Sequence, residues 1–162
     1  DFLRDLCGNR EILACGVPLL PVFGKVEYCR IGMDMSLSWD DKPYMRLFHS
    51  ERPSTKNTVL NTFFRRQLSG RAFLNDPDVF LLRDRNTALS PEQKSTLATT
   101  NALFGGLLFV SDDFSEYSEK QLAEYKTVLA LSERAENISV SLAAAPTVTY
   151  TLDGERKTLK LD

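Results

Sequence analysis

Polar and acidic side chains follow each of four short apolar segments of this sequence. The segments end, in order, at Cys15-Gly16, at Arg30 to Asp34, at Asn75 to Asp78 and at Ser111 to Asp113. If the segments are parallel strands, their carboxyl ends meet on one face of the fold. Carboxylates gathered there raise the pKa of at least one of their number, and such a carboxyl group serves as a general acid near neutral pH. The pattern indicates an acid–base site on that face.

Each of these groups also has a structural interpretation. The stretch Asn75-Asp76-Pro77-Asp78 is typical of an Asx turn, and Asp112 or Asp113 precedes a helix that either of them could cap. Arg30 and Asp34 could form a salt bridge at a strand end. The acidic groups could also bind Mg²⁺ or Ca²⁺, although the usual calcium-loop spacing is absent. Spacing alone leaves these alternatives open.

The helices and strands that must position these residues are predicted from the spacing of apolar residues and from the residues that start or end such elements. Residues 11–16, 25–32, 71–76 and 107–113 are predicted strands. Helices are expected over 1–10 and 59–70, each closed by a glycine, and after capping boxes that start at Ser90 and Ser118. The second of these capped helices places Leu122, Tyr125 and Leu129 on one face. Alternation of strands and helices predicts an α/β fold with a parallel sheet, either doubly wound or half of a (β/α)₈ TIM barrel.

The periodicity changes to two after residue 135. The segments "ISVSLA", "TVTYTL" and "ERKTLKL" alternate, and Asp153-Gly154 matches a two-residue hairpin turn. Residues 1–135 are therefore expected to form the α/β part, and residues 136–162 the beginning of an antiparallel β domain. Neither the Rossmann nor the P-loop fingerprint occurs, which argues against the common nucleotide-binding version of the fold.

The composition of the chain argues against several classes of function. The 162 residues carry a net charge of −2, which gives no electrostatic basis for binding nucleic acid or an anionic membrane. Three cysteines, Cys7, Cys15 and Cys29, form no close pair, so neither a disulfide framework nor a structural zinc site is expected, and a reducing, cytoplasmic location is the simplest interpretation. The single histidine, His49, has no partner at a catalytic spacing and is expected at the surface. No cofactor is indicated.

The combination of four motifs resembles the melibiase-type α-galactosidases of glycoside hydrolase family 36. The motifs are "CGVPLLPVFG", "YCRIGMDMSLSW", "RAFLNDPDVFLLRD" and "GGLLFVSDD", in this order over residues 1–135. The resemblance implies a (β/α)₈ barrel, of which this chain holds strands five to eight, followed by the start of the C-terminal β domain. It also implies hydrolysis of terminal α-galactosides, as in melibiose and raffinose, with retention of configuration by two aspartates.

The resemblance assigns roles to three residues. Asp34, in the R-x-x-x-D motif, is the expected acid/base, and Arg30 and Cys15 are expected to line the sugar site. Met33 stands where the family commonly has proline. The family nucleophile, in a K-x-D-F stretch, is expected to be absent: Asp1-Phe2 imitates its end, but the residues between Asp1 and Cys15 are too few for the intervening helix and strand.

Three expectations about partners follow. The chain is expected to be inactive alone, to have the missing N-terminal half of the same enzyme as its natural partner, and to self-associate through its unpaired strand edges. A related α-glycosidase or galactosyltransferase of the same clan, and a non-catalytic carbohydrate-binding half barrel, are the alternative functions.

Overall fold

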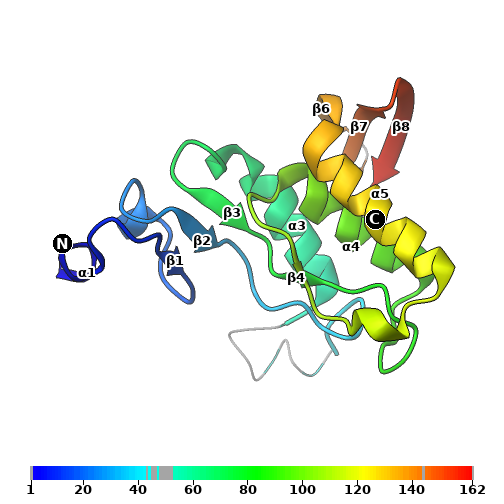
Figure 1. Ribbon diagram of the computed structural model, residues 1–162, viewed down its shortest axis with the longest axis horizontal. Coiled ribbons are helices and arrows are strands. Elements are labelled where there is room, and N and C mark those ends of the chain that lie inside the picture. Colours follow the sequence, from blue (N-terminus) through cyan, green and yellow to red (C-terminus); the bar gives the residue numbers. More distant parts are fainter. Residues whose placement is uncertain (1, 43, 45–46, 48–52, 144, 162) are drawn as a thin grey trace.

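The computed structural model describes residues 2–42, 44, 47, 53–143 and 145–161, so the predictions for Asp1 and His49 lie outside the described residues. Figure 1 labels the helices and strands. In chain order the elements are α1 (Phe2–Cys7), β1 (Leu13–Ala14), the 3₁₀ turn η1 (Leu20–Val22), β2 (Tyr28–Arg30), α3 (Thr55–Arg65), η2 (Arg66–Leu68), β3 (Leu74–Asp76), β4 (Val79–Phe80), α4 (Pro91–Phe104), β5 (Phe109–Val110), η3 (Phe114–Glu116), α5 (Glu119–Arg134), β6 (Glu136–Ser141), β7 (Thr147–Leu152) and β8 (Glu155–Lys160).

The four predicted strand segments are present and run parallel. One sheet has the order β1-β2-β3, and β4 pairs with β5 in a second one. The third predicted segment, 71–76, holds β3 and ends at Asp76 as expected; the short strand β4 follows it without having been predicted, after a break at Pro77-Asp78 where Asp78 takes a left-handed backbone with φ 76°. The register places Arg30 directly opposite Asp76.

The two faces of the three-stranded sheet have different environments. Ala14, Cys29 and Asn75 lie on a buried face, and the Asn75 amide donates to backbone carbonyls at the C-terminal ends of α3 and α4. Leu13 and Leu74 point to the other face because side chains alternate along a strand, and they are 41% and 38% exposed. This second face is therefore apolar and partly open to solvent at Leu13 and Leu74, whereas its carboxyl end carries the ion pair of Arg30 and Asp76.

Both predicted capping boxes are confirmed. The Ser90 hydroxyl accepts from the Gln93 backbone N–H, and Ser118 and Gln121 make the same pair at the start of α5. The predicted face of α5 is only partly covered, since Leu122 and Leu129 remain 38% and 36% exposed. The helix instead packs on the core mainly through Val128 and Leu131, which are buried.

The C-terminal segment is the predicted antiparallel sheet, in the order β6-β7-β8. Asp153 and Gly154 connect β7 and β8 with φ values of 51° and 82°, as a type I′ hairpin turn requires. Figure 1 shows this sheet, in orange to red, beside α5. Val148, Tyr150 and Leu152 of β7 belong to the same apolar cluster as the buried residues of α5. Within the described ranges, no helix is both long and apolar enough to cross a membrane.

Candidate functional site

A cavity of about 430 Å³ lies at the carboxyl ends of β1 and β2. Cys15, Arg30 and Asp34, the three residues singled out in the sequence, all line it, together with Asn61 and Arg65 of α3. Its volume falls within the range of about 300–1,000 Å³ that is usual for small-molecule sites. The fold therefore brings the three predicted residues to one place.

Arg30 is the centre of an ionic cluster in this cavity. Its Nε lies 3.0 Å from an Asp76 oxygen, its Nη2 lies 3.1 Å from Asp78, and its Nη1 lies 3.1 Å from Asp34. The side chains of Asp76 and Asp78 are 1% and 9% exposed, whereas that of Asp34 is 77% exposed. Two carboxylates thus hold the guanidinium from the protein side, and the third faces solvent.

Burial and charge act in opposite directions on Arg30. Burial alone lowers the pKa of Arg30, but the hydrogen bond to Asp76 and the charges of Asp76 and Asp78 outweigh it and raise the pKa above its ordinary value. Burial also raises the pKa of the neighbouring Cys29 thiol, and the charge of Asp76 adds to this increase. Arg30 is consequently a permanent cation, and Cys29 is an uncharged core residue.

The stretch from Asn75 to Asp78 forms the predicted turn and also holds Arg30. An Asp76 oxygen accepts from the Asp78 backbone N–H at 2.9 Å, which is the predicted Asx turn. The same two aspartates also bind Arg30. Sequence reasoning counted these aspartates among the acidic groups at the strand ends but did not pair them with Arg30; the parallel register of β2 with β3 was the signal that could have found the pair of Arg30 and Asp76.

The loop that carries Asp34 is fixed by residues from distant parts of the chain. The Met35 N–H donates to Asp78 at 2.7 Å, and the Thr58 hydroxyl of α3 donates to the Met33 carbonyl at 3.2 Å. Further along, the Ala88 N–H donates to the Leu37 carbonyl. Trp39, the last residue of the motif "YCRIGMDMSLSW", packs on the main apolar cluster and does not line the cavity.

This chain is similar to solved structures of an α-galactosidase. An α-galactosidase from Thermus thermophilus, TtGalA, in complex with p-nitrophenyl α-D-galactopyranoside superposes with a TM-score of 0.71 and 25% identity, covering 95% of this chain and 30% of that one. TtGalA in complex with stachyose gives a TM-score of 0.69 and 27% identity, covering 79% and 28%. This chain has an α-galactosidase-like fold. It spans about 30% of the length of the structures it matches, and no family model matches it.

The acidic residues at the end of β5 have structural roles in the α-galactosidase-like fold. Asp113 caps η3, where it accepts from the Ser115 N–H, so the capping interpretation of this pair is confirmed. The Asp112 side chain is fully buried and accepts from the Leu82 N–H, the Arg83 guanidinium and the Tyr117 hydroxyl. Burial of the Tyr117 phenol and its hydrogen bond to Asp112 raise the pKa of Tyr117. Neither aspartate lines the cavity.

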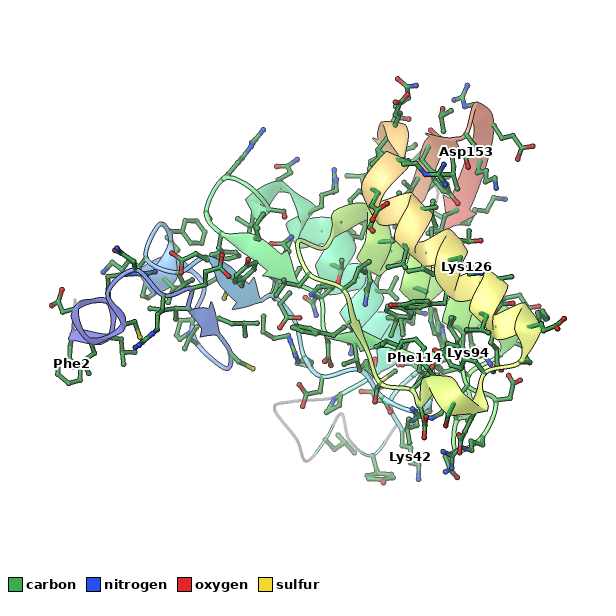
Figure 2. All side chains as sticks on the ribbon, in the orientation of Figure 1. Phe2, Lys42, Lys94, Phe114, Lys126 and Asp153 are labelled. Atoms are coloured by element: carbon green, nitrogen blue, oxygen red, sulfur yellow. The ribbon has the colours of Figure 1, made fainter. Side chains whose placement is uncertain are left out.

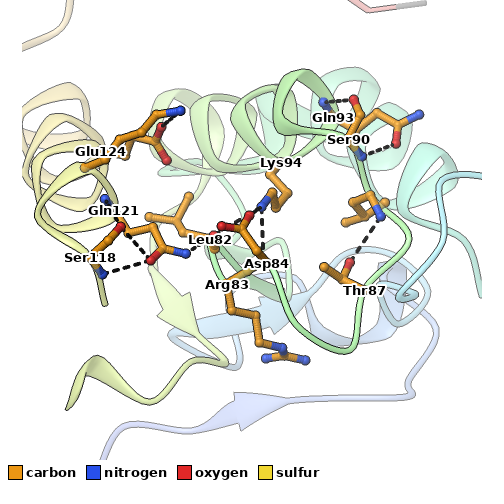
Figure 3. Close-up of polar contacts among 12 residues, drawn as sticks. Leu82, Arg83, Asp84, Thr87, Ser90, Gln93, Lys94, Ser118, Gln121 and Glu124 are labelled. Atoms are coloured by element: carbon orange, nitrogen blue, oxygen red, sulfur yellow. Dashed lines mark hydrogen bonds and ion pairs between the residues drawn. The ribbon is translucent and has the colours of Figure 1, made fainter. Parts of the chain in front are cut away.

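A second polar cluster joins the end of β4 to two helices (Figure 3). The ammonium of Lys94, a residue of α4 that is 6% exposed, donates to the carbonyls of Leu82 and Arg83 and pairs with Asp84. The Gln121 amide of α5 donates to the same Leu82 carbonyl at 2.9 Å. Figure 2 labels Lys94 and, on α5, Lys126. This cluster pairs backbone carbonyls that follow β4, and none of its residues lines the 430 Å³ cavity.

Proposed function

We propose that this chain is part of a retaining α-galactosidase that hydrolyses terminal α-galactosides of the melibiose and raffinose type. The observation that carries the proposal is the convergence of Cys15, Arg30 and Asp34 on one cavity in an α-galactosidase-like fold. The similar structures hold p-nitrophenyl α-galactopyranoside and stachyose, both α-galactosides. Asp34 is the acid/base in this proposal, and Arg30 and Cys15 line the galactose site.

The chemistry assigned to Asp34 is a double displacement. Asp34 protonates the departing glycosidic oxygen while a second carboxylate, supplied from outside these 162 residues, attacks the anomeric carbon. Asp34 then removes a proton from the water that hydrolyses the glycosyl–enzyme ester. The two carboxyl groups must lie about 5–5.5 Å apart. The exposure of Asp34 leaves room for both a sugar and such a partner.

Arg30 has a defined place in this mechanism. Three of its nitrogens each contact a different carboxylate. A guanidinium carries five N–H groups, so two remain for sugar hydroxyls. Asp76 and Asp78 fix the guanidinium plane, and Arg30 in turn holds the Asp34 carboxylate on the side of the cavity.

The same proposal includes the architecture. The parallel strands are assigned to strands five to eight of a (β/α)₈ barrel over residues 1–135, and residues 136–162 begin a β domain. The exposed residues Leu13, Leu74 and Phe109 then face the barrel interior, where the missing N-terminal half covers them. In the absence of that half, the apolar face and the free edges of β1 and β5 favour self-association.

A non-catalytic carbohydrate-binding half barrel is the second candidate. It is favoured by one observation: among the described residues that line the cavity, Asp34 is the one acidic side chain. The gene sequence upstream of Asp1 separates the two functions, because an enzyme requires a K-x-D strand there and a binding module does not. A related α-glycosidase of the same clan that acts on another sugar is distinguished from an α-galactosidase by the substrate that it cleaves.

The experiment is hydrolysis of p-nitrophenyl α-galactopyranoside by the complete polypeptide that contains this chain. Asp34→Asn is expected to lower kcat by several orders of magnitude, while Asp113→Asn, which follows β5 of the second sheet and lies outside the cavity, leaves it within a few-fold of wild type. An inactive wild-type polypeptide, or equal activity of Asp34→Asn and wild type, contradicts the proposal. Turnover by the isolated 162-residue chain that Asp34→Asn abolishes contradicts the assignment of the nucleophile to the missing part.

A further inference from the structure

We infer that Asp78 is a positioning residue that sets the orientation of the Asp34 acid/base through two separate contacts. The inference rests on the proposed function. Asp78 is 6% exposed and lies at the break between β3 and β4, one strand away from the loop of Asp34. Its own carboxylate does not line the cavity, so it acts on the substrate only through its neighbours.

The first contact fixes the backbone next to the acid. One Asp78 oxygen accepts from the Met35 N–H at 2.7 Å, a short, charge-assisted hydrogen bond to the residue directly after Asp34. The second contact fixes the partner of the acid, because the other oxygen lies 3.1 Å from Arg30 Nη2 while Arg30 Nη1 holds Asp34. One buried carboxylate thus binds the acid's main chain and its counter-ion at the same time.

Asp34 has few other restraints. Its side chain is 77% exposed, and in the part of the chain that the structure describes its carboxylate has Arg30 as its one hydrogen-bonding partner. The direction of this side chain therefore depends on the backbone at 34–35 and on Arg30, and Asp78 controls both. A displacement of about 1 Å at a reacting group is enough to reduce a rate by about 100-fold.

Asp78 is itself held firmly. Its N–H donates to Asp76 at 2.9 Å, and its carbonyl accepts from the fully buried Asn101 amide at 3.1 Å. Its φ of 76° lies in the left-handed region, which asparagine and aspartate tolerate better than other residues with a side chain and which glycine adopts freely. This backbone aims the carboxylate across to the neighbouring loop.

The backbone requirement allows two variants that separate conformation from contact. Asp78→Gly keeps the left-handed backbone without strain and removes both contacts. Asp78→Asn also suits this backbone and keeps an oxygen that accepts from Met35, but it loses the ion pair with Arg30. A role confined to the turn predicts that both variants behave like wild type.

The test compares two α-galactosides with different leaving groups, hydrolysed by the complete polypeptide. The departing sugar of melibiose needs a proton from the acid, whereas p-nitrophenolate leaves without one. If Asp78 positions Asp34, Asp78→Gly lowers kcat/KM for melibiose by about 100-fold and kcat/KM for the nitrophenyl substrate by less than about 10-fold, because kcat/KM reports the first step, in which the leaving group departs. Asp78→Asn recovers part of the melibiose activity, and Asp113→Gly changes neither rate.

Equal losses on the two substrates, or no loss on melibiose, overturn the positioning role. A spectroscopic readout on the complete polypeptide accompanies the kinetics: the Met35 amide proton resonance should move upfield in Asp78→Gly and remain near its wild-type position in Asp78→Asn. If Asp78→Gly fails to fold by circular dichroism, Asp78→Asn decides, since a melibiose loss without a nitrophenyl loss supports the role and matched losses overturn it. Failure of the proposed function is separate, because in that case Asp34→Asn itself leaves hydrolysis unchanged.

Discussion

Replacing Arg30 by methionine is expected to destabilise the folded chain far more than the same change at Arg134. Methionine retains most of the apolar stem and removes the charge. At position 30 it leaves the carboxylates of Asp76 and Asp78 buried without a counter-ion, since their side chains are 1% and 9% exposed. Arg134 pairs with Asp153 at 2.8 Å, but both side chains are more than half exposed.

The magnitudes follow from this difference in burial. Removing one partner of a buried, hydrogen-bonded ion pair costs about 3–5 kcal/mol, whereas an exposed pair contributes about 0–1 kcal/mol. Urea unfolding measures the difference: with a slope of about 2 kcal/mol per molar, Arg30→Met should lower the midpoint by about 1.5–2.5 M. Arg134→Met should lower it by less than about 0.5 M.

A triple variant tests the physical reason. Asp76→Asn and Asp78→Asn, added to Arg30→Met, remove the two buried negative charges and keep oxygens that accept from the Asp78 and Met35 N–H groups. Replacing all members of a buried ionic cluster by uncharged residues is often neutral, so most of the lost stability should return. Equal midpoints for Arg30→Met and Arg134→Met, or no recovery in the triple variant, refute the view of Arg30 as the counter-ion of this site.

Three further predictions concern other parts of the chain. Burial and the hydrogen bond to Asp112 raise the pKa of Tyr117. The contribution of this phenol to stability is therefore complete below its ordinary pKa of about 10 and is lost as the pH rises above that value. Tyr117→Phe should reduce the fall in Tm between pH about 8 and about 11. Phe109 is an exposed apolar residue of β5, and Phe109→Lys should shift the isolated chain from associated species towards monomer in sedimentation velocity at micromolar concentration. Leu142, near β6, is also exposed, and Leu142→Lys should cause no such shift. A wild-type chain that is already a clean monomer counts against the half barrel. Ser90→Ala should lower the free energy of unfolding by about 1 kcal/mol in urea, and Ser90→Asp should restore most of it, because the cap hydroxyl accepts from the Gln93 N–H; identical midpoints for Ser90→Ala and wild type exclude that contribution.

Local patterns in the sequence were sufficient for the elements. The capping boxes at Ser90 and Ser118 and the Asp153-Gly154 turn are correct because they depend on residues within one turn of chain. Strand existence was also predictable from short apolar runs. The strand β4 was not predicted, because it resumes after a left-handed residue, Asp78, that a proline-containing stretch does not specify uniquely.

The candidate site was predictable in part. Arg30 and Asp34 are four residues apart at a strand end, and their ion pair is visible in the spacing. The contacts of Arg30 with Asp76 and Asp78 join residues that are more than 40 positions apart, and they require the register of β2 against β3. The partial exposure of the Leu122–Leu129 face of α5 could not be predicted either, because the burial of a helix face depends on the elements that pack against it, and periodicity does not identify those elements.

The central claim is that Asp34 is the acid/base of an α-galactosidase site. The most direct measurement is hydrolysis of melibiose and p-nitrophenyl α-galactopyranoside by the complete polypeptide with Asp34→Ala, with and without sodium azide. Azide needs no general base, so it attacks the anomeric carbon of the glycosyl–enzyme ester and displaces the enzyme carboxylate. The account predicts loss of melibiose hydrolysis, a smaller loss on the nitrophenyl substrate, and α-galactosyl azide as the product. Equal losses on both substrates with no azide adduct would contradict it.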